Sequence, residues 1–546
     1  MTVSRRTFLG STAAGAAAIS LPGIAGAASP VGDVVGKITV GYQGWFACAG
    51  DGAPINGWWH WAQDWSRAPT PSNTGIKAWP DMRDYAATYK TGYANFGNGA
   101  AATLFSSYDQ STVDTHFGWM QQNGCDTAAL QRFNPNGGEG ATRDAMAVKV
   151  RSAAESHGRK FYIMYDVSGW TNMQSEIKAD WTNKMAALTA SSAYARQNGR
   201  PVVGIWGFGF DDANHPWTAT ACLDVINWFK SQGCYVMGGV PTYWRTGVND
   251  SRPGYLDAYH AFDMISPWMV GRIGDAAGSD WFYTNLNQGD QADCNARGID
   301  YQPCVLPGDL SARQRAHGDF MWRQFYNMTR LGAQGLYISM FDEYNEGNQI
   351  AKTAETQAFV PTNSGMFALD EDGTACSADY YLRLTADGGR MLKGQIALTA
   401  TRPTQPVAAS GGTIVGKVVT LRSRADNKYV TAENAGAAPL IANRGAIGGW
   451  EQFDVLDAGG GNIALKAHAN GLIVCADNAG ASPLIANRSA VGPWETFRLI
   501  QNANGTVSLL AYVNNRYVTA ENGGAASLIA NRTAIGTWEQ FDLVID

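Results

Sequence analysis

The sequence predicts an α/β protein, a (β/α)8 TIM barrel that is followed by an all-β trefoil domain. Two observations predict this fold class: eight apolar segments alternate with helical patterns over residues 36–398, and a unit of 44 residues occurs three times over residues 414–546. Between them, residues 399–413 are rich in Pro, Ala, Ser, Thr and Gly without apolar periodicity, which is typical of a linker.

Residues 1–28 are predicted to be a twin-arginine signal peptide and not part of the fold. Arg5 and Arg6 precede a weakly apolar run rich in Ala and Gly, and small residues suited to signal-peptidase cleavage follow near Ala28. We therefore expect a secreted protein.

Composition narrows the range of partners. No later segment has the roughly 18 consecutive apolar residues that a membrane span needs, and the net charge of −6 comes from acids and bases mixed along the chain. Without a basic stripe, neither nucleic acid nor a membrane is expected as a partner. The chain is expected to act as a monomer.

Cysteine and histidine usage gives little sign of a metal site. The sequence has no C-x-x-C or H-E-x-x-H motif and its seven His are scattered, so we expect neither a metal nor a cofactor. Eight Cys in an exported protein permit disulfides, with Cys222/Cys234 and Cys294/Cys304 as candidate pairs, although spacing does not give the connectivity.

The barrel strands are predicted from near-continuous apolar runs, as expected for strands covered on both faces. They lie at 38–46, 126–133, 160–167, 201–208, 234–241, 262–269, 301–308 and 335–341. Helical patterns lie between them, for example at 111–124, 141–158 and 311–332. The segment 101–109 competes as a ninth strand, and we interpret it as a loop that leads into the first helix.

The repeated unit has the pattern of strands and hairpins. The segment at 438–453 recurs at 482–497 and 526–541 with its Asn and Trp positions kept, and Gly/Asn turns separate alternating apolar and polar positions. Three copies favour a closed β-trefoil over a solenoid. The domain resembles fascin-like or ricin-type trefoils, which exported enzymes carry as carbohydrate-binding modules, so the resemblance implies polysaccharide targeting. We interpret the repeated Trp first as an apolar position that any trefoil requires, with binding left to loop residues that the sequence does not single out.

Active sites of (β/α)8 barrels lie at the carboxyl ends of the strands. The residues there are Tyr42, Gln43, Trp45, Arg132, Asp166, Trp206, Asp211, Asp212, Tyr243, Trp244, Trp268, Glu343 and Glu346. Aromatic side chains mixed with carboxylates, with little Lys and no Gly-rich phosphate loop, are typical of a site for a neutral sugar rather than a phosphorylated metabolite.

Glu343 and Glu346 are the candidate catalytic residues. Their i, i+3 spacing places both carboxyls on one face if the chain turns helically after the eighth strand, and Gly347 permits a sharp turn. Two close carboxyls repel, so one keeps its proton to higher pH, and a glycosidase needs one proton donor and one ionised group. The alternative is a solvated acidic loop without chemistry.

Several segments resemble one known family. VGYQGWFACAGDG with WWHWAQDW, SSYDQSTVDTHFGWMQQNGCD and SMFDEYNEGNQI resemble, in this order, the glycoside hydrolase family 99/71-like group of endo-α-mannosidases and related α-1,3-glucanases. The resemblance implies that Glu346 is the general acid/base. It implies that Glu343 takes the proton of the substrate 2-hydroxyl, which forms an anhydro-sugar with retention. Tyr344 and Asn345 stand where that family carries Trp and His, which leaves the preference for mannose open.

The substrate-binding candidates rest on strand-end position or on the resemblance. They are Asp166, Tyr42, Trp45, His60, Trp206, Asp211 and Tyr344. The Asp166 carboxylate could instead cap the next helix, and the aromatic residues could equally pack in the core.

The sequence therefore predicts a secreted, retaining and endo-acting glycoside hydrolase of an α-linked polysaccharide, with an α-mannan favoured and the trefoil tethering the polymer. Alternatives are a hydrolase of α-1,3-glucan, arabinan or xylan, a non-catalytic carbohydrate-binding protein, and an inverting enzyme with Asp166 as a distant acid.

Overall fold

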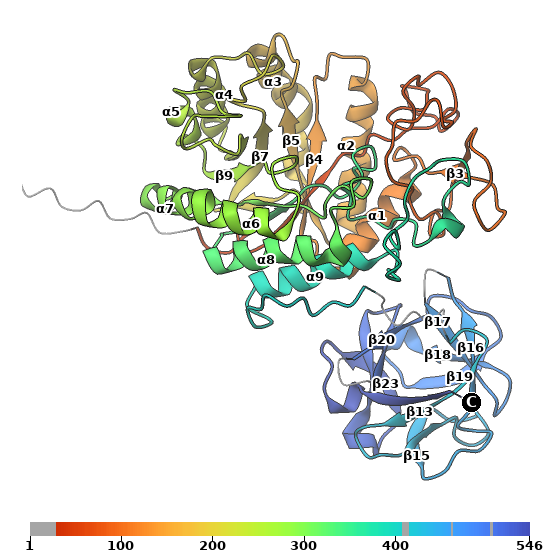
Figure 1. Cartoon of the computed structure of the whole chain (residues 1–546). Coiled ribbons are helices and arrows are strands. Elements are labelled where there is room, and N and C mark those ends of the chain that lie inside the picture. Colours follow the sequence, from red (N-terminus) through yellow and green to blue (C-terminus); the bar gives the residue numbers. More distant parts are fainter. Residues whose placement is uncertain (1–28, 407–413, 460–461, 503–505, 546) are drawn as a thin grey trace, which may run out of the picture.

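A computed structural model describes residues 29–406, 414–459, 462–502 and 506–545 (Figure 1). Two hydrophobic cores share no residue: one is drawn from residues 34–391 and the other from residues 414–541. Separate cores are what distinguishes two domains from one. The predicted signal peptide, residues 1–28, and part of the predicted linker, residues 407–413, lie outside the described residues.

The first domain is built on a parallel sheet that curls into a TIM-like barrel. Its strands are β1 (Ile38–Tyr42), β4 (Thr127–Arg132), β5 (Lys160–Asp166), β7 (Arg200–Trp206), β8 (Tyr235–Val240), β9 (Met264–Pro267), β10 (Asp300–Tyr301), β11 (Cys304–Val305) and β12 (Leu336–Ile338). Parallel pairing runs from β1 through β4, β5, β7, β8 and β9 to β10, and β12 pairs with both β1 and β11.

The curled sheet returns to its start through residues 300–305, which contain both β10 and β11. Pro303 has no N–H group and interrupts the strand. Its carbonyl accepts a hydrogen bond from the Tyr337 N–H (3.1 Å), while the neighbouring Gln302 N–H donates to the Ile265 carbonyl (2.8 Å). One interrupted strand therefore contacts β12 on one side and β9 on the other.

Helices lie around the outside of the sheet (Figure 1). They are α1 (Gln110–Gln122), α2 (Gly140–Ser156), α3 (Met173–Asp180), α4 (Ala219–Ser231), α5 (Leu256–Tyr259), α6 (Ala276–Phe282), α7 (Gln288–Arg297), α8 (Asp319–Leu331) and α9 (Tyr380–Leu392). In α8, an apolar face that includes Phe325 and Met328 is buried, and Gly332 ends the helix in the left-handed conformation at φ 84°.

Each predicted strand overlaps an observed one, and the structure shortens most of them at the carboxyl end because the chain leaves the sheet to form the site. The segment 101–109 is mainly a loop before α1, as expected. Only β3 (Thr103–Leu104) forms there, and it pairs with β2 (Tyr89–Lys90) in a separate sheet. A further short strand, β6 (Arg196–Gln197), pairs with β7.

The helix predicted over 311–332 was wrong in its first part. The α-helix begins at Asp319, and the preceding turns surround the buried Arg315. Its guanidinium donates to the carbonyls of Gly308, Gly347 and Gln349 at 2.8–3.0 Å. Arg315 therefore stabilises the chain that follows Glu346. The helical pattern of the sequence does not indicate these hydrogen bonds.

The candidate disulfides were also wrong, because all eight cysteines are free and buried. Cys222 lies near the start of α4 and Cys234 lies beyond its end at Ser231. The rise of about 14 Å along the helix from Cys222 to Ser231 keeps the two cysteines too far apart for a disulfide. Cys294 lies on α7, outside the sheet, whereas Cys304 belongs to the sheet itself.

The second domain has the predicted three-fold organisation. Its strands are β13 (Val418–Ser423), β14 (Tyr429–Thr431), β15 (Ile441–Arg444), β16 (Phe453–Asp457), β17 (Ile463–Ala467), β18 (Ile473–Ala476), β19 (Leu484–Arg488), β20 (Phe497–Gln501), β21 (Val507–Ala511), β22 (Arg516–Ala520), β23 (Leu528–Arg532) and β24 (Phe541–Ile545). Six of them, β13, β16, β17, β20, β21 and β24, pair in a closed barrel. The pairs β14–β15, β18–β19 and β22–β23 form three hairpins, so each repeat supplies four strands.

Candidate active site

A cavity of about 440 Å³ opens at the carboxyl ends of the barrel strands. Its lining comes from the ends of β1, β4, β5, β7 and β12 and from the chain after β9. Of the candidate residues, the structure brings seven to this lining. They are Gln43, Trp45, Asp166, Trp206, Trp268, Glu343 and Glu346.

Glu343 lies at the inner end of the cavity, where its side chain is almost fully buried (5% exposed). One carboxylate oxygen, Oε1, accepts a hydrogen bond from Gln43 Nε2 at 3.0 Å, and Oε2 has no partner among the described residues. Burial raises the pKa of Glu343 well above its usual value, and the charge of Glu346 raises it further.

Glu346 lies at the mouth of the same cavity and is exposed. Its N–H donates to the Glu343 carbonyl at 3.3 Å, so the two acids flank a single tight turn instead of beginning a helix. Gly347 leaves this turn at φ 70°, a left-handed conformation that favours glycine. Partial desolvation raises the pKa of Glu346; the nearby Lys77 opposes the shift and Asp309 adds to it.

Asp342 orients Gln43, the residue that contacts Glu343. It is fully buried, and its two oxygens accept from the N–H groups of Gln43 and Gly44, both at 2.8 Å. Burial raises the pKa of Asp342 to about 6, and these hydrogen bonds oppose the rise. Because Gln43 in turn donates to Glu343, Asp342 fixes the orientation of the residue that holds the catalytic candidate.

A buried arginine that the sequence did not single out supports the near wall. Arg143 of α2 donates from Nη1 to the carbonyls of Gln43 (3.2 Å) and Gln131 (3.1 Å). Its guanidinium lies over the ring of Trp45, and His60 stacks on Trp45 at 3.8 Å between ring centroids. Trp45 is therefore held rigidly at the cavity. His60 does not line the cavity and contributes by stacking on Trp45.

The far wall carries Asp166, which accepts from the Ser168 N–H at 2.9 Å. Burial raises the pKa of Asp166 above its usual value. Ser168 Oγ lies 2.9 Å from His215 Nε2, and His215 Nδ1 lies 2.7 Å from Asp212 Oδ1. A serine, a histidine and an aspartate in this order resemble an acyl-transfer triad. However, a carboxylate beside the serine opposes an oxyanion, so we assign the network to holding Asp166.

Four buried polar atoms around the cavity have no hydrogen-bond partner among the described residues. They are Gln43 Oε1, Trp45 Nε1, Trp206 Nε1 and Glu343 Oε2. Buried polar atoms are nearly always paired in proteins. Two donors and two acceptors converging on one space suit a ligand rich in hydroxyl groups, each of which can donate and accept.

The other candidate residues named here do not line the cavity. Tyr42 is buried, with its hydroxyl 3.0 Å from His116 Nδ1, and the Tyr344 hydroxyl donates to the Lys352 carbonyl at 2.9 Å, so both face the core. The Asp211 side chain is exposed and pairs with Arg252, at 3.4 Å. Arg132 is buried between Asp180 and Asp144. Tyr243 packs against Phe282 and Trp244 against Tyr259, outside the cavity lining.

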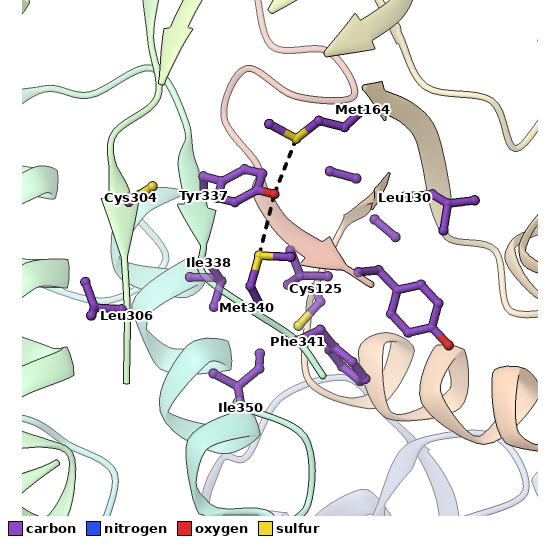
Figure 2. Close-up of a cluster of buried hydrophobic side chains, with 14 of the residues drawn as sticks. Cys125, Leu130, Met164, Cys304, Leu306, Tyr337, Ile338, Met340, Phe341 and Ile350 are labelled. Carbon is purple, nitrogen blue, oxygen red and sulfur yellow. Dashed lines mark hydrogen bonds between the residues drawn. The ribbon is translucent and has the colours of Figure 1, made fainter. Parts of the chain in front are cut away.

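Met164, Tyr337 and Met340 form the floor of the cavity. Figure 2 shows these three side chains next to one another within the buried core. The hydroxyl of Tyr337 lies between the sulfur atoms of Met164 (3.4 Å) and Met340 (3.8 Å). Gly41 of β1 lies beneath, where an added Cβ would come within 2.2 Å of Met340 Sδ and 2.5 Å of Tyr337 Oη.

We expect Gly41→Ala to destabilise the protein by about 1–3 kcal/mol, because the methyl group overpacks the floor. Thermal denaturation measures the loss. Gly138→Ala is the matched control, since a Cβ there meets nothing within 4 Å. Equal melting temperatures for Gly41→Ala and the control would contradict this packing.

No group of three or more His, Cys, Asp or Glu suited to a metal ion occurs among the described residues. In the same part of the chain, no helix is long and apolar enough to span a membrane.

Comparisons with known proteins find similarity among solved structures. No family model and no curated protein matches the chain. A GH99 endo-alpha-mannosidase from Bacteroides thetaiotaomicron is 14% identical with a TM-score of 0.46, over 66% of this chain and 98% of that chain. The same enzyme in complex with BIS-TRIS-propane gives 14% and 0.44 over the same shares. A designed three-fold symmetric protein, ThreeFoil, is 24% identical over 23% of this chain and 97% of that chain, with a TM-score of 0.22.

Proposed function

We propose that this protein is a secreted glycoside hydrolase that cleaves an α-linked polysaccharide, with an α-mannan favoured. The observation that carries the proposal is the pair Glu343 and Glu346, whose pKa values are both raised, in a cavity bordered by Trp45 and Trp206. Flat indole rings suit the apolar faces of sugars, and two unequal carboxyls are what glycosidic cleavage needs.

The proposed chemistry proceeds in two steps with retention, as the family resemblance implies. Glu346 gives its proton to the leaving oxygen while Glu343 takes the proton of the 2-hydroxyl, whose oxygen attacks C1 as the glycosidic bond breaks. Glu346, now ionised, then takes a proton from water, which opens the anhydro-sugar at C1, and Glu343 returns its proton to O2. Both carboxyls end in their starting states.

In the free protein, the order of the two pKa values is the reverse of what these roles require, because the mechanism starts with the proton on Glu346. Glu343 is more buried, so burial favours the proton there and the charge on the exposed Glu346. A sugar that covers the mouth removes water from Glu346 and raises its pKa, while a 2-hydroxyl that donates to Glu343 stabilises the ionised form of that residue. We propose that substrate binding moves the proton to Glu346.

We expect a bell-shaped dependence of kcat/KM on pH, with both limbs at higher pH than ordinary glutamates would give. Cleavage needs one proton on the pair, so activity falls when pH drops below the lower pKa and when it rises above the higher one. Both pKa values are raised by desolvation, and that of Glu343 also by repulsion. Initial rates on soluble α-mannan measure the profile, and limbs at ordinary glutamate values would contradict it.

The proposal is tested by incubating the purified protein with α-mannan, α-1,3-glucan, arabinan and xylan. Product sizes separate endo-acting from exo-acting cleavage, and proton NMR of the first-formed anomer separates retention from inversion. Cleavage of one α-linked polymer supports the hydrolase, and binding without cleavage of any polymer would support the non-catalytic alternative.

We further propose export through the twin-arginine route and action as a monomer. Replacing both Arg5 and Arg6 by Lys should retain the protein inside the cell, as fractionation would show. Light scattering of the mature protein should give the mass of one chain.

A further inference from the structure

The three repeats of the trefoil each expose a tryptophan at the same position. Trp450, Trp494 and Trp538 are 39%, 37% and 38% exposed, although the sequence first suggested core positions for them. The core of this domain is made instead by aliphatic residues and three phenylalanines, Phe453, Phe497 and Phe541. Large indole rings left in solvent at three equivalent places need a different explanation.

Each repeat also carries the same polar set, one acid after its second strand and an Asn-Arg pair on its third. In the first repeat the Ala432 N–H, next to Glu433, donates to the Trp450 carbonyl at 2.9 Å, and in the third a Cβ added at Gly523 would lie 3.9 Å from the Trp538 ring. The three clusters are Glu433, Asn443, Arg444 and Trp450; Asp477, Asn487, Arg488 and Trp494; and Glu521, Asn531, Arg532 and Trp538.

Hydrogen bonds fix the first and third clusters in the same way. Asn443 Nδ2 and Arg444 Nη2 each donate to Glu433, both at 2.7 Å. In the third repeat the corresponding bonds from Asn531 and Arg532 to Glu521 are both 2.8 Å. The Asn bond is the main cause that lowers the pKa of Glu433, so this acid is ionised at neutral pH.

The second cluster has the shorter Asp477 and keeps the arginine contact. Arg488 Nη2 donates to Asp477 Oδ1 at 2.7 Å, and the guanidinium carbon lies 6.0 Å from the centre of the Trp494 ring. The Trp494 carbonyl accepts from the Ala476 N–H at 2.8 Å, immediately before Asp477. The ring, the cation and the acid therefore form one continuous surface.

A buried acid makes the turn around each tryptophan rigid. Glu451, Glu495 and Glu539 follow the tryptophans directly, and each carboxylate accepts from the N–H group of a glycine three residues earlier at 2.7–2.9 Å. A fixed aromatic platform loses little conformational entropy when a ligand binds.

We propose that each cluster is a binding site for one neutral sugar unit of a polysaccharide, so that the trefoil holds the polymer at three equivalent points. The indole face stacks on the apolar face of a pyranose, while the paired arginine and carboxylate donate to and accept from its hydroxyls. Each exposed cluster contains one acid and one arginine that neutralise each other, which favours a neutral polymer over an anionic one.

The symmetry of the barrel sets how a polymer is held. Three equivalent repeats around a closed barrel direct their sites in three different directions, so one straight chain cannot occupy all three. Simultaneous binding therefore requires a branched or bundled polysaccharide, on which the sites act together through effective concentration. This inference rests on the proposed function for the choice of polymer and not for the sites themselves.

The test uses the full chain with Glu346→Gln, so that bound polymer is not consumed, and measures depletion by insoluble α-mannan, α-1,3-glucan, arabinan and xylan. Against the polymer that binds, each single Trp→Ala change at 450, 494 or 538 should weaken binding several-fold. The triple Ala variant should weaken it by about 10²-fold or more, because avidity is lost. A triple Trp→Phe variant keeps aromatic faces and should bind between the two.

Trp281→Ala is the matched control, because Trp281 is 50% exposed on α6 of the barrel domain and belongs to no cluster. Unchanged thermal transitions establish that the variants are folded. Equal binding by the parent and the triple Ala variant, or no binding of any of the four polymers by the parent, would overturn the proposal. Cleavage of the same polymers is measured separately with the chain that keeps Glu346. Failure of the hydrolase and failure of the three sites therefore give different results.

Discussion

Glu346→Gln is expected to slow cleavage of the polysaccharide by about 10²–10⁴-fold, the usual contribution of a general acid/base. The amide keeps the shape of the side chain at the cavity mouth but has no proton to give to the leaving oxygen. Reducing-end release from the polymer measures the loss, while depletion by insoluble polymer should show unchanged binding.

The leaving group gives a sharper test of this role. Fluoride departs without protonation, so fluoride release from an oligosaccharyl α-fluoride should be reduced much less than polymer cleavage by Glu346→Gln. The control is Glu155→Gln on the exposed surface of α2, where the glutamine can still accept from Ser191 Oγ. Equal losses with the polymer and the fluoride would show that Glu346 does not act as an acid.

Glu343→Gln is expected to lower the rate on polymer and fluoride alike, again by about 10²–10⁴-fold, because neither leaving group removes the need to activate the 2-hydroxyl. The same variant should be more stable than the parent at neutral pH. The pKa of Glu343 is raised in the folded protein, so the parent loses stability as pH rises above the unfolded-state pKa, and a neutral amide avoids this loss.

Melting temperatures over a pH series measure that second effect. The difference between Glu343→Gln and the parent should vanish in acid, where the parent carboxyl is protonated in both states. A difference that is constant with pH would mean that folding does not raise the pKa of Glu343.

Much of the fold follows from local patterns in the sequence. Apolar runs locate the barrel strands because both faces of a parallel sheet are covered, and the repeats with their Gly/Asn turns locate the trefoil strands. The sharp turn at Gly347 was expected from the sequence, whereas the helical turn expected for Glu343 and Glu346 is a single tight turn in the structure.

Contacts distant in sequence could not be predicted. Arg143 lies in an ordinary helical pattern, and nothing nearby indicates that it reaches the carbonyls of Gln43 and Gln131. Strand-end position does not tell which way Tyr42 and Tyr344 point, because the chain leaves the sheet there and period-two alternation no longer applies. A weak signal did exist for His215, which follows Asp212 at a spacing that permits their hydrogen bond.

The difference in pKa between Glu343 and Glu346 is measured most directly by NMR titration of the two carboxyls with carbon-13 label in glutamate. In the free protein both should titrate above the usual glutamate value, with Glu343 the higher, and Glu346→Gln should bring the Glu343 value down because a repelling charge is gone. Ordinary titration of Glu343, unmoved by Glu346→Gln, would contradict a coupled pair at this cavity.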